Sequence, residues 1–304
     1  MKFKVLIIVN AVAGKQNIKK YIPYIINNFE ELNFQTQIEY TTIENDAYNI
    51  IKNYKEYCDV ILVCGGDGTL NQVIQGVYET DKRVCIGFVP VGTTNDFAKS
   101  LNVSFDKLHI SENIYKYRSK KVDIGLIENK IFNYVVAFGI FSKSSYKTSS
   151  KLKRRIGKLA YILSGIKDIF NYKTYQLEIQ TDTEKIQDEF FYGSISNSKY
   201  IGGFNLFKSK SIEFNDGKFE AVFVKKPKNF YQTIKLIFKV LNGNLKDDNI
   251  YYLQTSMLKI KCNEPIELSI DGEYGGAKKD ITIYVQNQYI EYLVPSNEKQ
   301  VSVL

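Results

Sequence analysis

The chain has 304 residues, 44% of them hydrophobic, so it is long enough to form two globular domains with cores of their own. Its 41 Lys and Arg residues against 33 Asp and Glu residues give a formal charge of +8, which suits nucleic acid, an anionic membrane face or solubility alone. Its one histidine, His109, excludes a histidine-rich zinc site, and no stretch approaches the ~20 apolar residues of a membrane span. The four cysteines show no CxxC spacing, which indicates reduced core residues of a cytosolic protein.

The first apolar run, residues 4–9, predicts a buried strand that ends in small residues. Asn10, Gly14 and Lys15 follow this strand, and a glycine and a lysine at its carboxyl end suggest a turn that faces phosphate. A helix is expected over residues 18–29 and a second strand over residues 35–40. Thr42 follows that strand, where a threonine either caps the next helix, which is the default interpretation, or contacts a nucleotide.

The strongest local pattern begins with the unbroken apolar run of residues 60–64, which predicts a strand buried on both faces in a parallel sheet. The turn after it places three glycines around one carboxylate: Gly65, Gly66, Asp67 and Gly68. Thr69 is expected to cap the helix that follows, whose apolar residues recur at helical spacing. Free N–H groups and the positive end of the helix dipole make this turn an anion site, with phosphate as the natural ligand. The turn has neither a Walker A ending nor the GxGxxG spacing.

The next apolar run, residues 84–89, ends in a second turn of small and polar residues: Gly92, Thr93, Thr94, Asn95 and Asp96. Strands that alternate with helices at this spacing imply right-handed crossovers, so the turns should meet at the carboxyl edge of one parallel sheet. Open α/β sheets bind ligands at that edge, and Asp67 and Asp96 would line one crevice there. An acid in a phosphate-binding turn usually positions a divalent cation or a hydroxyl proton.

After Lys121 the pattern changes to short strand-like runs with polar turns, which predicts a mainly antiparallel, β-sandwich-like domain. The expected strands cover residues 130–141, 176–180, 190–196, 218–224, 258–261 and 266–270. The sequence around Asp216 is a hairpin signal, and helices are expected over residues 157–172 and 231–241. We expect an α/β domain over residues 1–122, completed by 290–304, and a β-rich domain over 123–289.

A basic segment between Lys143 and Lys158 contains no acidic residue and leads directly into the first of these helices. It is either a solvated loop or a surface that binds anionic lipid headgroups, with about even weight. The second interpretation would make the protein cytoplasmic and peripheral to the inner face of the membrane.

Taken together, six motifs resemble the bacterial soluble diacylglycerol kinases and related lipid kinases, over nearly the whole chain. They are residues 10–15, GGDGT at 65–69, GTTNDF at 92–97, VDIG at 122–125, the residues from Lys153 to Tyr161, and DGE at 271–273. NAD kinases also carry GGDGT, so the combination with GTTNDF and DGE makes the likeness specific.

The resemblance implies a kinase that holds ATP and Mg²⁺ and phosphorylates a lipid hydroxyl, with diacylglycerol as the expected acceptor and phosphatidic acid as the product. It assigns Asp67 to the nucleotide–magnesium site, Asp96 and Asp123 to a supporting acidic network, and Glu273 to the general base. Asp216 matches the family's structural magnesium site. The nucleotide-contact positions would be Asn10, Gly14, Lys15, Thr42, Gly65, Gly66, Gly68, Thr69, Gly92, Thr93, Thr94 and Asn95.

Other interpretations stay open at this point. The acceptor could be another lipid, such as a sphingoid base or phosphatidylglycerol, or the enzyme could be an NAD kinase. A catalytically silent nucleotide-binding or lipid-binding regulator is disfavoured by the retention of all four acids. No nucleic-acid partner is expected, and the sequence leaves open whether the chain forms a homodimer.

Overall fold

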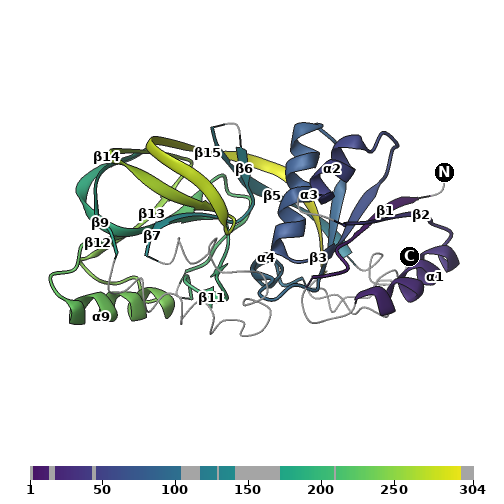
Figure 1. The fold of residues 1–304 in the computed structure, drawn as a ribbon, viewed down its shortest axis with the longest axis horizontal. Coiled ribbons are helices and arrows are strands. Elements are labelled where there is room, and N and C mark those ends of the chain that lie inside the picture. The colour runs from purple at the N-terminus through teal and green to yellow at the C-terminus, as the bar shows by residue number, and fades with distance from the viewer. Residues whose placement is uncertain are drawn as a thin grey trace. The chain divides into compact units, whose positions relative to one another are not determined.

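The structure is a computed structural model that describes residues 3–13, 18–42, 46–103, 117–128, 130–140, 172–208 and 210–295 (Figure 1). The chain divides into two compact units, Met1–Lys121 with Ile290–Leu304, and Val122–Tyr289. Gly14, Lys15, the basic segment between Lys143 and Lys158 and most of the helix expected over residues 157–172 lie outside the described residues.

Unit 1 contains a sheet in the order β4-β3-β1-β2, in which neighbouring strands run parallel. Its strands are β1 (Lys4–Val9), β2 (Gln35–Tyr40), β3 (Val60–Gly65) and β4 (Cys85–Pro90). Every residue of β3 is buried, which explains its uninterrupted apolar sequence. The helices are η1 (Ile18–Lys20), α1 (Ile22–Glu31), α2 (Asp46–Asn53), α3 (Asp67–Glu79) and α4 (Asp96–Ser100).

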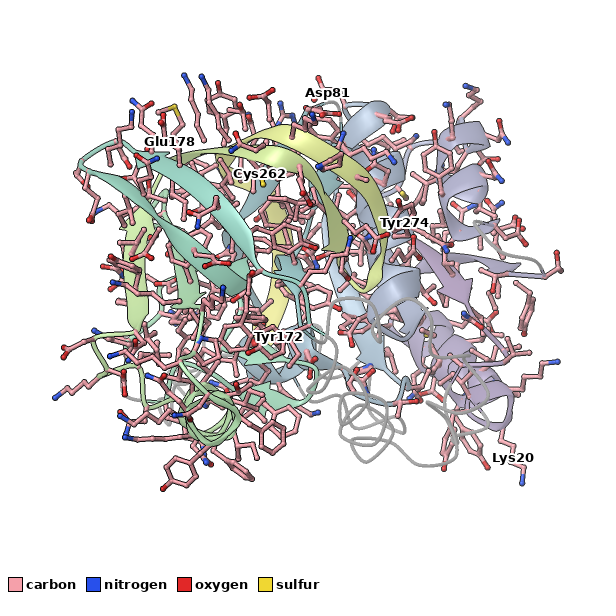
Figure 2. The ribbon with its side chains drawn as sticks, turned by 60° about the vertical axis from the view of Figure 1, so that its left-hand side comes forward. Lys20, Asp81, Tyr172, Glu178, Cys262 and Tyr274 are labelled. Carbon is pink, nitrogen blue, oxygen red and sulfur yellow. The ribbon has the colours of Figure 1, made fainter. Side chains whose placement is uncertain are left out.

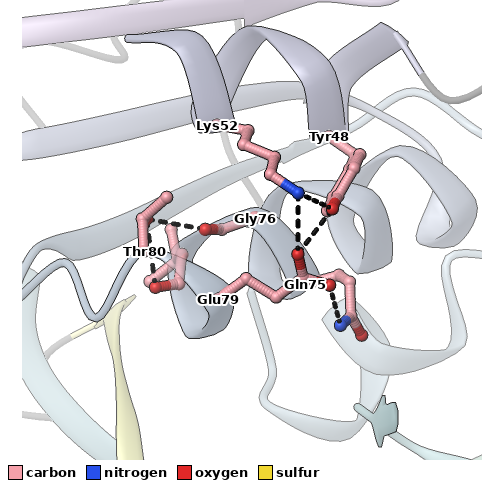
Figure 3. A network of polar contacts seen from close by, with 7 residues as sticks. Tyr48, Lys52, Gln75, Gly76, Glu79 and Thr80 are labelled. Carbon is pink, nitrogen blue, oxygen red and sulfur yellow. Dashed lines mark hydrogen bonds and ion pairs between the residues drawn. The ribbon is translucent and has the colours of Figure 1, made fainter. Parts of the chain in front are cut away.

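The helix that carries Asp67 packs closely against α2 because of a glycine (Figure 3). A Cβ on Gly76 of α3 would lie 2.8 Å from the Cβ of Ile51 in α2, so only glycine fits at this contact. Polar side chains close the outer edge: the Tyr48 hydroxyl donates to Glu79 over 2.5 Å, and the Lys52 ammonium lies 3.3 Å from the same carboxylate oxygen. The buried contact and the polar edge together fix α3, and with it the position of its first residue.

Unit 2 is a set of antiparallel strands that close around one apolar core. β9 (Lys185–Ser196) pairs with β8 (Tyr175–Thr181) through its first half and with β7 (Val135–Gly139) through its second half. β14 (Met257–Ile270) pairs with the same two strands, so the four strands form a ring. β5 (Tyr117–Ile127) begins in unit 1 and continues into unit 2. The remaining elements of unit 2 are β6 (Lys130–Phe132), β10 (Tyr200–Ile201), β11 (Phe204–Asn205), β12 (Phe219–Lys225), α9 (Phe230–Leu241) and β13 (Ile250–Thr255).

The last strand, β15 (Glu273–Pro295), takes part in both units. Its first part pairs antiparallel with β14 in unit 2, and near its end Glu291 and Tyr292 pair parallel with β4 in unit 1. The return of residues 290–294 to the first sheet was expected from the sequence.

Three local predictions were wrong. Thr69 does not cap α3, which begins two residues earlier with Gly66 as its N-cap. The runs 258–261 and 266–270 belong to one strand, β14, whose register shifts between them. The turn at Asp216 is not a hairpin, because the strand before it, β11, pairs with β10 and not with β12. In the part of the chain that the structure describes, no helix is long and apolar enough to cross a membrane.

Candidate functional site

The two glycine-rich loops meet at the carboxyl ends of β3 and β4 in unit 1. The Val91 N–H donates to the Gly65 carbonyl over 2.8 Å. A Cβ on Gly92 would lie 2.6 Å from the Cα of Gly66, so the two backbones touch at a point where no side chain fits. Neighbouring parallel strands end at the same sheet edge, which is why loops about 25 residues apart in sequence lie together here.

Asp67 holds the loop after β4 in place by capping α4, the helix that follows this loop. Its carboxylate accepts hydrogen bonds from the Asp96 N–H at 3.1 Å, the Phe97 N–H at 3.3 Å and the Thr94 hydroxyl at 3.2 Å. The N-cap residue of α4, Asn95, makes no side-chain cap of its own, so Asp67 supplies the acceptor from a different helix.

The charge of Asp67 is subject to opposing effects. Burial raises the pKa of the carboxyl, while the backbone N–H groups of Asp96 and Phe97 and the Thr94 hydroxyl oppose that increase. Asp67 is also the first residue of α3, so the positive ends of two helices lie near one carboxylate.

Asn10 and Thr69 connect the end of β1 to the same loop. The Asn10 amide donates to the Thr69 hydroxyl over 2.9 Å. Thr69 packs so closely against Gly65 that a Cβ added to Gly65 would lie 2.6 Å from the Cβ of Thr69. The side-chain oxygens of Asn71 and Asn95 are buried and accept no hydrogen bond from any described residue. Buried acceptors without donors are uncommon, so these two oxygens could accept hydrogen bonds from a ligand or from water.

The other predicted residues of unit 1 differ in their surroundings. The Thr42 N–H and hydroxyl donate to the carboxylate of Asp46, the first residue of α2, at 2.6 and 3.0 Å. Thr93 is exposed, and a Cβ on Gly68 would meet no atom within 4 Å. Asp96 is 2% exposed, and its carbonyl accepts from the Ser100 hydroxyl.

The remaining acids belong to unit 2, where Asp123 of β5 joins two turns. Its carboxylate accepts from the Gly217 N–H at 2.7 Å and from the Gln288 N–H at 2.6 Å. Burial raises its pKa, these two N–H groups lower it, and the charge of Asp216 raises it further. Asp216 itself is exposed and accepts from the Lys218 N–H at 3.0 Å.

Glu273 is exposed at the start of β15, directly after a two-residue turn formed by Asp271 and Gly272. Both turn residues have positive φ, 49° and 87°, as the tightest hairpins require. Unit 2 thus presents Glu273 on a rigid hairpin, while Asp67 and Asp96 belong to unit 1.

Sequence reasoning placed Asp271 in the DGE motif and missed its structural role. Its buried carboxylate accepts from the N–H groups of Asn133, Tyr134 and Val135 at 2.6, 3.0 and 2.9 Å. It also missed Glu220, which is 1% exposed and accepts from the Gln254 amide at 3.1 Å. No local signal distinguishes these acids, because their partners come from distant parts of the chain.

No cluster of three or more His, Cys, Asp or Glu residues suited to a metal occurs within the described ranges. A carboxylate-rich cage for a cation is therefore absent from that part of the chain. A Mg²⁺ ion held by one or two carboxylates together with phosphate oxygens remains compatible with the site.

Comparison with known families matches both units of the chain. Residues 4–127 match the model described as the diacylglycerol kinase catalytic domain, and residues 134–290 match the YegS C-terminal NAD kinase beta sandwich-like domain. The diacylglycerol kinase of Bacillus subtilis (strain 168) is 32% identical over 274 residues, which cover 89% of each chain. That of Staphylococcus carnosus (strain TM300) is 30% identical over 306 residues, covering 100% of this chain and 99% of the relative.

Solved structures share the two-domain fold. A diacylglycerol kinase structure from Bacillus anthracis str. Sterne has a TM-score of 0.76 at 22% identity and covers 96% of both chains. Another from the same strain has a TM-score of 0.81 at 24% identity and covers 96% of this chain and 97% of its own. At these identities the structures establish the two-domain fold, and the family models and relatives establish the chemistry. The chain therefore belongs to the diacylglycerol kinase family and is a lipid kinase.

Proposed function

We propose that this protein transfers the γ-phosphate of Mg-ATP to the free hydroxyl of diacylglycerol, giving phosphatidic acid and ADP. The observation that carries the proposal is the meeting of the two glycine-rich loops around Asp67 at the positive ends of α3 and α4. The relatives named diacylglycerol kinase support the acceptor.

The phosphates of ATP fit the surface formed by the two loops. Gly66 and Gly92 leave no side chain between the backbone and a ligand, and the N-terminus of α3 favours negative charge. The residues we assign to nucleotide binding in this unit are Asn10, Gly14, Lys15, Thr42, Gly65, Gly66, Asp67, Gly68, Thr69, Gly92, Thr93, Thr94 and Asn95. Besides Asp67, the side chains of five of these residues already form hydrogen bonds within the unit, so their assignment is less direct than that of the glycines: Asn10, Thr42, Thr69, Thr94 and Asn95.

Asp67 would also hold the magnesium ion. Three donors occupy its two oxygens, and a carboxylate has about four acceptor positions, so one remains for a cation. When bound, Mg²⁺ neutralises phosphate charge during transfer. Asp216, exposed beside Asp123, is the residue of unit 2 that we assign to a second metal position.

We assign Glu273 as the general base, which accepts the proton of the lipid hydroxyl while that oxygen bonds to phosphorus and the bond to ADP breaks. In a loose transition state the proton leaves late, so a carboxylate is basic enough. Asp96 and Asp123 would position the loops of their own units, because the N–H of buried Asp96 donates to Asp67 and the buried Asp123 carboxylate accepts from the Gly217 N–H. We further propose that the protein acts at the cytoplasmic face of the membrane, with the Lys143 to Lys158 segment near anionic lipid.

The test is a kinase assay with labelled ATP and Mg²⁺, offering diacylglycerol, a sphingoid base, phosphatidylglycerol and NAD in parallel. Label should appear in phosphatidic acid, and chelation of magnesium should abolish it. Glu273→Gln should reduce kcat by at least about 100-fold with an unchanged melting temperature, because the side chain is exposed. Label in NAD, or in no lipid, would refute the proposed reaction.

A further inference from the structure

Helix α9 presents large aromatic side chains to solvent, away from the core that the helix covers. Phe230, Tyr231 and Phe238 are 48%, 77% and 61% exposed. Tyr231, Lys235 and Phe238 follow at i, i+4 and i+7, so they form one stripe along the helix. Figure 1 shows α9 at the periphery of unit 2. Within the described residues, no other helix exposes more than one large apolar side chain.

The opposite face of α9 packs against the core of unit 2, and the exposed aromatic residues take no part in this packing. Thr233, Leu236, Ile237 and Val240 are buried. Tyr172 packs on that side, with its hydroxyl 3.3 Å from the Thr233 hydroxyl. One apolar face of α9 therefore anchors the helix to unit 2, and a second apolar face, which the packing of unit 2 does not require, lies in solvent. Clustered exposed aromatics usually mark a binding surface.

The charge around α9 is positive. Residues 221–246 contain six lysines and no acid, and residues 190–212 contain three lysines and no acid. Lys225, Lys226 and Lys239 pair with acids outside these runs. Lys228 and Lys235 are exposed and form no ion pair with any described residue.

The second basic run reaches the end of the same helix. Gly243, just after α9, has a φ of 71°, and a Cβ there would lie 2.9 Å from the Lys208 nitrogen. Lys208 and Lys210 are exposed, so their charge adds to that of the helix on one side of unit 2.

We propose that the exposed face of α9, defined by Phe230, Tyr231, Lys235 and Phe238, docks on the surface of an anionic bilayer. Aromatic rings favour the headgroup level of a membrane, and lysines beside them attract anionic lipid. The occupant is a lipid surface because the excess of unpaired lysine complements anionic headgroups, which a second copy of the same basic face would repel. This inference rests on the proposed function, since a lipid kinase must meet its acceptor in a bilayer.

The absence of tryptophan from the chain allows a direct test. Phe238→Trp introduces a single indole on the proposed surface, and Tyr24→Trp introduces one on α1 of unit 1, where Tyr24 is 58% exposed. With vesicles of phosphatidylcholine and phosphatidylglycerol in equal parts, the indole at 238 should shift its emission to shorter wavelength and be quenched by brominated lipid. The indole at 24 should show neither change.

Vesicle sedimentation then measures the contribution of each group. Lys228→Gln and Lys235→Gln should each weaken binding about fivefold, corresponding to about 1 kcal/mol per lysine near an anionic surface. Tyr231→Ala with Phe238→Ala should weaken it at least about tenfold, whereas the matched control Tyr24→Ala should not change it. Circular dichroism should show native helix content in all variants, because every substituted side chain is exposed.

Kinase assays with a short-chain, monomeric diacylglycerol separate this inference from the proposed function. The α9 variants should keep wild-type rates on that substrate and lose rate on diacylglycerol in vesicles. Unchanged vesicle binding, or an indole at 238 that stays in water, would overturn the docking surface even if the kinase is fully active. A change of oligomeric state in the aromatic variant, without a change in vesicle binding, would overturn it in favour of a contact between copies. Absence of activity on the monomeric substrate would instead refute the proposed reaction.

Discussion

Asp271 shows how one buried carboxylate can determine the shape of a unit. It accepts three backbone N–H groups from residues 133–135, more than 130 residues earlier in the chain. Asn133 and Tyr134 lie between β6 and β7, and Val135 is the first residue of β7. Removing Asp271 would take a charged acceptor away from three buried N–H groups, which is more costly than losing an exposed ion pair.

We expect Asp271→Ala to lower the free energy of unfolding by about 3 kcal/mol or more, because hydrogen bonds to a charged acceptor are among the strongest in proteins. Thermal and urea unfolding would measure the change. Asp280→Ala is the control, since Asp280 is exposed on β15, and it should change stability by less than about 0.5 kcal/mol. Equal effects of the two substitutions would contradict the anchoring role of Asp271.

Glu220 makes the stability of unit 2 depend on pH. Burial raises the pKa of its carboxyl from 4.5 to about 7, against the hydrogen bond from Gln254, and its second oxygen has no described partner. The pKa of Glu220 is higher in the folded protein than in the unfolded chain, so protonated Glu220 contributes to the stability of the fold. This contribution is complete below pH 4.5 and is lost as the pH rises through about 7.

In Glu220→Gln this titration is absent. The wild-type protein should therefore lose up to about 3 kcal/mol of stability relative to the variant between acidic pH and pH above about 7, because the pKa of Glu220 is about 7 in the folded protein against 4.5 ordinarily. Urea unfolding of both proteins across this range would test it. A constant difference between them would mean that Glu220 does not titrate in the native state.

At the scale of elements, the contact between α2 and α3 depends on a missing side chain. Gly76 lies in the middle of α3, where alanine would normally stabilise a helix by about 1 kcal/mol. A Cβ there would instead lie 2.8 Å from Ile51 and 3.2 Å from the Tyr48 carbonyl. Alanine at position 76 would therefore gain helix propensity and lose packing. We expect the packing loss to be larger, because the added Cβ would come close to the backbone of Tyr48, which cannot move aside as a side chain can.

We predict that Gly76→Ala lowers the free energy of unfolding by about 1–3 kcal/mol, the usual cost of overpacking. Gly68→Ala on the same helix is the matched control, because a Cβ there would meet no atom within 4 Å and should be neutral or stabilising. Chemical denaturation would distinguish them. If Gly76→Ala proved the more stable of the two, it would contradict the inference that the contact between α2 and α3 requires glycine at position 76.

At the scale of the whole molecule, the last strand, β15, pairs with β4 in the sheet of unit 1. Tyr292 is 1% exposed, pairs beside Ile86 of β4, and packs its ring 5.1 Å from that of Phe97. The Phe97 N–H is one of the donors to Asp67. A residue near the C-terminus thus supports the helix that Asp67 caps.

Tyr292→Ala should destabilise the protein by about 3–5 kcal/mol and weaken nucleotide binding, because α4 loses the ring that it packs against. Differential scanning calorimetry and titration with ATP analogues would measure the two effects. Tyr284→Ala on the same strand, where the side chain is 47% exposed, is the control and should do neither. Loss of stability with unchanged nucleotide affinity would show that α4 does not depend on Tyr292.

The surface of this molecule is harder to predict from the sequence than its core. Tyr274, labelled in Figure 2, is 54% exposed, and the amino-acid type alone does not separate it from the buried aromatic residues. The α9 helix was expected from its apolar spacing, yet that spacing assigned no direction to Phe238. Only the packing of Leu236 and Ile237 against unit 2 leaves Phe238 in solvent.

The sequence by itself determined the features that depend on neighbouring residues: the buried strands, the glycine turns after β3 and β4, and the helix expected over residues 231–241. These follow from periodicity and from backbone freedom at glycine, which act over a few residues. Only the tertiary structure decided that Asp67 caps α4, that Thr69 packs under Gly65, and that Asp271 anchors residues 133–135. Each of these contacts either joins separate elements or depends on packing around a turn, and a buried carboxylate or hydroxyl takes whichever donor or neighbour the folded chain brings to it.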